Sequence, residues 1–355
     1  MKRSFAFVVV GLSGLVLAAG CSSSSAAVVA PSEPATTGAP LATSNTADTA
    51  NSADTAPPST SGTSATTLAT SASSGAYEPA PIDGLPIVGE GTWKAVDTVG
   101  DTPVLWTSDF HPLADVPSVK VSAAIFDQER LTAALFNGTK LPGGGPWQNA
   151  DKVATPAKSA LVAAFNGGFL FKHIDGGYFT EGKEIKPLIA GQATVGIRHD
   201  GRMVLGIYGK DMTNDGSWLS LRENLPPMVI NGKNVMADYP GTFWGNDFHN
   251  VDLNYRTALC QRADGKLMYL AMGLVRANTL GDELARLGCT LGMELDINHH
   301  WPQFTYFRPD SRGTSGVLLD AVAMWKPERY VTTSEKDFVA LFDPASLPAG
   351  SLYGN

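Results

Sequence analysis

Asx-Gly pairs between apolar runs constrain the fold of this chain more than any other feature. The pairs are Asp200-Gly201, Asn231-Gly232 and Asp264-Gly265. Asn or Asp followed by Gly suits a two-residue β-hairpin loop, because both positions of that loop take a positive φ angle. The flanking runs with the clearest strand character are 193–198, 203–207, 257–261 and 266–271. The sequence therefore predicts a sheet whose neighbouring strands run largely antiparallel.

Two other segments have features of helices. In 280–287 the three leucines fall on one helical face. In 334–342 a serine is followed three residues later by an aspartate, which is close to the spacing of a capping box. Hairpins with interspersed helices predict an α+β domain, a largely antiparallel mixed sheet with flanking helices.

The first 21 residues predict export. Lys2 and Arg3 precede an apolar run at 5–17, and small residues lead into Cys21. This is the pattern of a bacterial lipoprotein signal, in which the Cys21 thiol is acylated and becomes the new N-terminus. The alternatives are an ordinary secretory peptide and a transmembrane helix, which needs about 20 apolar residues. We expect the chain to be lipid-anchored, extracytoplasmic and in the bacterial cell envelope, attached to the membrane without spanning it.

Residues 22–76 consist almost entirely of Ser, Thr, Ala, Pro and other small residues, with no aromatic side chain. Such a segment cannot bury enough apolar surface to offset its chain entropy, so we expect a disordered tether. Residues 77–355 then form a single domain. The chain has a net charge of −8 and no basic run in this domain, which argues against nucleic acid as a partner.

Two cysteines remain once Cys21 is assigned to the lipid anchor. They are Cys260 and Cys289. In an exported protein a leftover pair favours a disulfide over two free thiols.

Two polar clusters follow apolar, strand-like runs. The first is Asn166-Gly167-Gly168-Phe169, and the second is Glu294-Leu295-Asp296-Ile297-Asn298. Side chains at a strand end leave the core and can meet a ligand. Two glycines without Cβ atoms also let the backbone approach a bound group closely.

Four segments occur in the order known from one enzyme family. They are 163–169 with its Asn-Gly-Gly-Phe, 255–259 with Arg-Thr-Ala before an Asp-Gly hairpin, the helix near 279–287, and 292–296 with Glu-Leu-Asp. Together they resemble the phosphodiester glycosidases, relatives of the enzyme that removes GlcNAc from a mannose phosphodiester. Many relatives continue Asp-Gly-Gly-Gly, whereas here Asp296 is followed by Ile-Asn-His-His-Trp-Pro.

The resemblance implies an extracytoplasmic hydrolase that cleaves a glycosyl-phosphodiester linkage in an envelope or extracellular glycan. The reaction needs a carboxylate for the oxocarbenium-like state, and a cation or amides for the phosphate. The expected catalytic residues are Asp296, Glu294 and Arg256. The expected substrate-binding residues are Asn166, Gly167, Gly168, His173, Asn298 and His299. Two residues apart on a strand, Glu294 and Asp296 should share a face, although Glu294 could instead form a structural salt bridge with Arg256.

The sequence predicts no cofactor. Adjacent histidines such as His299 and His300 point in opposite directions on an extended chain and lack the spacing of zinc ligands. The alternative that the sequence leaves open is a divalent cation such as calcium. Because the glycine-rich loop after Asp296 is missing, the alternative is a non-catalytic surface lipoprotein that binds glycans or acts as a scaffold. In either case the expected partners are a glycan or glycosyl phosphate, and the membrane through the N-terminal lipid.

Overall fold

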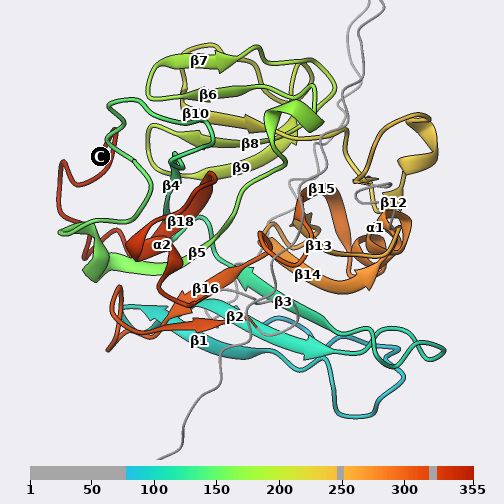
Figure 1. Ribbon diagram of the computed structural model, residues 1–355. Coiled ribbons are helices and arrows are strands. Elements are labelled where there is room, and N and C mark those ends of the chain that lie inside the picture. The colour runs from blue at the N-terminus through green and yellow to red at the C-terminus, as the bar shows by residue number, and fades with distance from the viewer. Residues whose placement is uncertain (1–76, 246–251, 320–325) are drawn as a thin grey trace, which may run out of the picture. The chain divides into compact units, whose positions relative to one another are not determined.

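The computed structural model describes residues 77–245, 252–319 and 326–355, which form three sheets (Figure 1). The eight-stranded sheet has the order β1 (Lys94–Val99), β2 (Thr102–Phe110), β3 (Val121–Phe126), β14 (Leu267–Val275), β13 (Asn254–Arg262), β15 (Cys289–Ile297), β11 (Val229–Ile230) and β12 (Lys233–Asn234). A five-stranded sheet has the order β7 (Lys183–Lys186), β6 (Tyr178–Thr180), β10 (Trp218–Glu223), β8 (Ala193–Arg198) and β9 (Met203–Ile207). The third sheet has the order β17 (Gly316–Leu318), β16 (Phe304–Phe307), β5 (Leu161–Asn166), β18 (Phe338–Phe342) and β4 (Thr132–Phe136).

The strand pairs within these sheets are antiparallel, as the sequence predicted. All three predicted hairpins form, joining β8 to β9, β11 to β12 and β13 to β14. At the tip of the second, Asn231 and Gly232 have φ angles of 51° and 77°. Two successive positive φ angles are what a type I′ turn requires. At the other two tips only the glycines, Gly201 and Gly265, have positive φ angles, so those turns are not of type I′.

Helices contribute less than the α+β prediction implied, so the fold is better described as sheet-rich. In the described ranges the α-helices are α1 (Ala277–Arg286) and the single turn α2 (Arg329–Thr332), beside short 3₁₀ turns that include η2 (Phe171–His173). The helix expected near 280–287 exists as α1. The one expected at 334–342 does not, because its apolar residues form β18 between β5 and β4. All five residues of β18 are buried, and a short apolar run fits a central strand as well as a helix.

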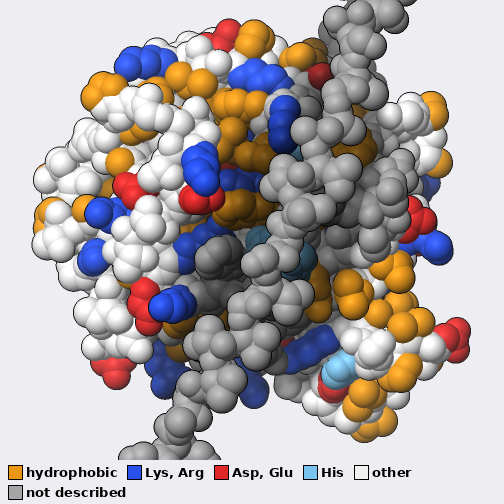
Figure 2. Space-filling view, in the orientation of Figure 1, with side chains coloured by type: hydrophobic (Ala, Val, Ile, Leu, Met, Phe, Trp, Pro, Cys, Tyr) orange, Lys and Arg blue, Asp and Glu red, His pale blue; other side chains and the backbone are white. Residues whose placement is uncertain are grey.

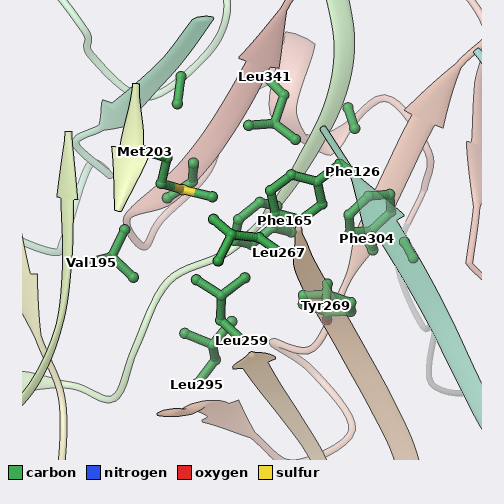
Figure 3. Close-up of a cluster of buried hydrophobic side chains, with 14 of the residues drawn as sticks. Phe126, Phe165, Val195, Met203, Leu259, Leu267, Tyr269, Leu295, Phe304 and Leu341 are labelled. Atoms are coloured by element: carbon green, nitrogen blue, oxygen red, sulfur yellow. The ribbon is translucent and has the colours of Figure 1, made fainter. Parts of the chain in front are cut away.

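The main core lies where the three sheets face one another (Figure 3). Tyr269 and Leu295 reach it from the eight-stranded sheet, Phe165 and Phe304 from the third sheet, and Val195 from the β8 side. Phe165 and Phe304 stack with ring centroids 5.8 Å apart. This core fixes β5 against β15, and the two strands end near each other. Figure 1 shows β5, β16 and β18 between the β6–β10 layer and the β1–β3 layer.

Cys260 of β13 and Cys289 of β15 are joined by a disulfide, the pairing that the sequence favoured. Their Cα atoms lie 5.6 Å apart. The bond ties the beginning of β15 to its neighbour, at the opposite end from Asp296. No helix in the described ranges is both long and apolar enough to cross a lipid bilayer.

Candidate active site

A tight bend follows β5 at Gly167 and Gly168. The N–H of Gly167 donates to the carbonyl oxygen of Asp337 at 3.0 Å, and the N–H of Phe169 donates to Asn224 Oδ1 at 2.9 Å. Between them lies Gly168, a buried residue whose N–H has no acceptor within the described part of the chain. Buried backbone N–H groups without a partner are rare. This donor is therefore suited to an oxygen atom that comes from solvent or from a ligand.

Neither position of the bend can carry a side chain without displacing its neighbours. A Cβ at Gly167 would lie 2.2 Å from Asp337 Oδ2, and one at Gly168 would lie 2.7 Å from Asn224 Oδ1. Asp337 cannot move freely, because its carboxylate is fully buried and accepts a hydrogen bond from Arg222 Nε at 2.7 Å.

Gly167→Ala is therefore expected to lower the free energy of unfolding by about 3 kcal/mol, the upper end for overpacking a core. Urea unfolding measures the change. Gly144→Ala is the matched control, since a Cβ there meets nothing within 4 Å, and it should shift stability by less than about 0.5 kcal/mol. Equal stability of the two variants would contradict the close packing of the bend.

Asp296 meets the bend directly, so the two predicted polar clusters do come together. Its N–H donates to the carbonyl oxygen of Gly167 at 3.0 Å. Thr257 Oγ1 donates to the carbonyl oxygen of Asp296 at 2.6 Å and lies 3.1 Å from Asn166 Nδ2. These contacts hold the end of β15 beside the end of β5.

Asn166 itself is part of the framework. Its Oδ1 accepts hydrogen bonds from the Tyr269 hydroxyl at 2.8 Å and from the backbone N–H of Gln303 at 3.0 Å. The side chain is 4 % exposed. Asn166 therefore supports the bend from the buried side. This is a structural role, in contrast to the substrate contact that the resemblance implied.

Lys336 is the group in this site that the sequence did not point to. Its Nζ forms an ion pair with Asp296 Oδ2, while Asp296 Oδ1 accepts the N–H of Ile297 at 2.9 Å. Burial lowers the pKa of Lys336 to about 7, and the nearby Asp337 partly opposes that effect. Lys336 lies just before β18. In the sequence, the only sign that it belongs to the site was its position next to Asp337, in a segment that was predicted to be a helix.

Arg256 and Glu294 form a separate, fully buried ion pair with Nη1 and Oε1 2.8 Å apart. The expectation that Glu294 shares a face with Asp296 was wrong, because β15 contains a bulge. Arg256 pairs with Ile297 and Ala258 pairs with Glu294, so two residues of β15, 295 and 296, lie opposite the single residue 257 of β13. The extra residue turns Asp296 away from Glu294. Arg256 does not reach an open cleft and instead forms the salt bridge that was the alternative for Glu294.

This environment makes stability depend on pH. Burial raises the pKa of Glu294 to about 7, although Arg256 acts in the opposite direction. With an unfolded value near 4.5, the folded state binds more protons between these two pH values. The contribution of Glu294 to stability is thus present below about pH 4.5 and is lost as pH rises to about 7.

Urea unfolding of the wild type and of Glu294→Gln at pH 4.5, 6 and 7.5 checks this direction. The wild type should lose up to about 3 kcal/mol relative to the variant across this range. Titration of all other groups cancels in the comparison. A difference that is independent of pH would mean that Glu294 stays ionised throughout.

The remaining predicted residues lie around the site in different roles. Asn298 has a φ of 82° and accepts the N–H groups of His300 and Trp301, so it shapes the turn after β15. The exposed His299 ring packs on His300 with centroids 3.9 Å apart. The Trp301 ring lies 5.1 Å from Lys336 Nζ.

His173 belongs to η2 and lines a hollow that residues 172–175 and 240–243 border. Within residues 77–245, 252–319 and 326–355, no three His, Cys, Asp or Glu side chains are grouped as ligands of a metal ion. The proposed lipidation site, Cys21, lies outside the described residues. The face in Figure 2 carries basic and acidic side chains next to each other, with hydrophobic side chains between them.

The part of the chain that contains these motifs also matches a known protein family. Residues 159–296 match the model of the phosphodiester glycosidase family, which confirms the resemblance found in the sequence. The catalytic domain of zebrafish N-acetylglucosamine-1-phosphodiester alpha-N-acetylglucosaminidase, auto-inhibited by its pro-peptide, is similar in structure, with 19 % identity over 70 % of this chain and 87 % of that chain and a TM-score of 0.46. A hypothetical protein from Synechocystis has 10 % identity over 70 % of this chain and 64 % of its own, with a TM-score of 0.43. No curated protein sequence matches the chain.

Proposed function

Because residues 159–296 match the phosphodiester glycosidase family, we propose that this protein hydrolyses a glycosyl-phosphodiester linkage in an envelope or extracellular glycan. The observation that carries the proposal is the Asp296–Lys336 ion pair at the bend whose Gly168 N–H has no acceptor within the described residues. The Asp296 carboxylate and the Lys336 ammonium group are paired, and the backbone of Asp296 is hydrogen-bonded to Gly167, the residue before Gly168. A carboxylate, an ammonium group and an amide N–H are the groups that separation of a sugar from a phosphate requires.

The reaction breaks the bond between the anomeric carbon and a phosphate oxygen. The bonding electrons leave with the phosphate, and the sugar passes through an oxocarbenium-like state that the carboxylate of Asp296 stabilises. Water then supplies the new hydroxyl group at the anomeric carbon. Because a phosphate monoester is a weak base, it leaves without a strong acid, but its charge needs compensation. In this proposal the ammonium group of Lys336 and the N–H of Gly168 provide it.

One observation favours the alternative, a protein that binds glycans without turnover. Trp301 lies against Lys336, in the loop where many relatives have consecutive glycines. A bulky side chain there narrows the space for a phosphate. Release of product separates the two functions, because a binding protein retains the glycan unchanged.

The direct experiment incubates the full-length protein in detergent with a panel of glycosyl phosphodiesters, including GlcNAc-1-phosphodiesters and UDP-GlcNAc, and measures free sugar. Release of sugar in stoichiometric excess over the protein supports hydrolysis. Saturable binding of the same compounds without any release over long incubation would establish the alternative.

We also propose that the protein is held at the extracytoplasmic face of the envelope by a lipid on Cys21, with residues 22–76 as its tether. The basic, apolar and small residues before Cys21 support this. Cys21→Ser is expected to abolish incorporation of an alkyne-labelled palmitate that the wild type takes up in cells. Equal labelling of both proteins would refute the anchor.

A further inference from the structure

A hollow of about 570 Å³ opens beside the bend, and none of its lining residues takes part in the proposed hydrolysis. Residues 172–175 line one side and residues 240–243 line another, with Gln192, Leu225 and Pro226 between them in the lining. The two walls meet where the rings of His173 and Phe243 lie nearly parallel, with centroids 6.2 Å apart. Its volume falls in the range of sites for small molecules.

The first wall is continuous with the catalytic bend. Residues 172–175 follow Phe169 within a few positions, and the charge of Lys336 contributes to lowering the pKa of His173, after burial and Lys172. Leu225 directly follows Asn224, which accepts the N–H of Phe169 and donates to the carbonyl oxygen of Glu294 at 2.6 Å. The hollow therefore continues from the bend that the backbone of Asp296 contacts.

The second wall is held by the buried ion pair. Arg256 Nη1 donates to the carbonyl oxygen of Trp244 at 2.6 Å. Trp244 is buried and has a φ of 46°, a left-handed conformation that is strained for a residue with a large side chain. The next residue, Gly245, packs so tightly on β15 that a Cβ would lie 2.2 Å from Ile297 Cδ1. Arg256 thus positions the wall that ends at Phe243.

The lining combines apolar surface with hydrogen-bonding groups of both kinds. Phe243, Pro226 and Pro240 supply apolar faces, and Lys172 and Asp175 supply opposite charges. The buried Oε1 of Gln192 has no hydrogen-bond partner within the described residues. For a phosphate, Asp175 offsets the attraction of Lys172, and an amide oxygen offers no hydrogen-bond donor. A pyranose ring, with an apolar face and hydroxyl groups that both donate and accept, matches this lining.

We propose that this hollow is the subsite for the sugar ring of the substrate. Because its first wall continues from the bend, we place the phosphate of the same molecule at the bend, and this part of the inference rests on the proposed function. Phe243 packs on the apolar face of the ring, and Gln192 and Asp175 bind its hydroxyl groups. These residues select the sugar.

Binding of uncharged sugars tests the hollow without requiring turnover. Calorimetric titrations with GlcNAc, glucose and mannose are made on the full-length wild type, on Phe243→Ala and on Gln192→Leu. Both side chains are only partly buried, so the variants should fold, which thermal unfolding verifies. Lys94→Ala, an exposed position on β1, is the matched control. We expect at least one sugar to bind, about tenfold more weakly in each hollow variant and within twofold of the wild type in the control.

The outcomes separate this inference from the proposed function. Sugar binding that is lost in both hollow variants supports the subsite even if no phosphodiester is cleaved. If phosphodiesters are cleaved with a KM that neither hollow variant changes, the hydrolase stands and the subsite is refuted. A wild type that binds none of the three sugars also refutes the subsite. In a cleaving enzyme, the subsite predicts a raised KM with a nearly unchanged kcat.

Discussion

Asp296→Asn is expected to lower kcat for a glycosyl phosphodiester by about 10³-fold, since a neutral amide cannot stabilise positive charge that develops at the anomeric carbon. The asparagine keeps the size of the side chain and an oxygen for the N–H of Ile297. The framework around it, through Gly167 and Thr257, uses only the backbone of residue 296 and is unaffected. Steady-state release of sugar measures the effect.

The control for this experiment is Asp310→Asn, an exposed aspartate whose replacement should leave kcat within twofold. Because Asp296→Asn leaves Lys336 buried without its partner, the double variant Asp296→Asn/Lys336→Met removes the charge imbalance and tests folding separately. Wild-type kcat in a folded Asp296→Asn protein would exclude Asp296 as the catalytic carboxylate.

Arg256→Met should lower the free energy of unfolding by about 3–5 kcal/mol, the largest effect on stability that we expect from a single substitution. The change leaves the carboxylate of Glu294 buried without a counter-charge, and its Oε2 already has no partner within the described residues. It also removes the donors to the carbonyl oxygens of Trp244 and Val275. Equilibrium unfolding in urea measures the loss.

Two comparisons make this result specific to the buried pair. Arg202→Met breaks an ion pair with Glu129 in which both side chains are about half exposed, and it should cost less than about 1 kcal/mol. The double variant Arg256→Met/Glu294→Met should recover much of the stability, because no charge is left buried. A loss of less than 1 kcal/mol in Arg256→Met would show that the variant leaves no charge buried, through protonation of Glu294 or access of water.

Much of the fold could be predicted from local chemistry. The Asx-Gly pairs predicted the three hairpins, because glycine readily takes the positive φ angle that it has in each of these turns. The polar clusters at the ends of β5 and β15 predicted which segments meet. The 334–342 segment was misread, since burial between two strands, which no local pattern reports, decided that it is β18.

The sequence by itself predicted the antiparallel architecture, favoured the disulfide between Cys260 and Cys289, and pointed to a shared site for Asp296 and the Gly167-Gly168 bend. Only the tertiary structure decided the partners of the acidic residues. The bulge in β15 arises from its register against β13, and it sends Glu294 to Arg256 and Asp296 to Lys336, 40 residues further along the chain. Turn conformation depends on neighbouring residues, whereas the partner of a buried charge depends on which distant strands the core brings into contact.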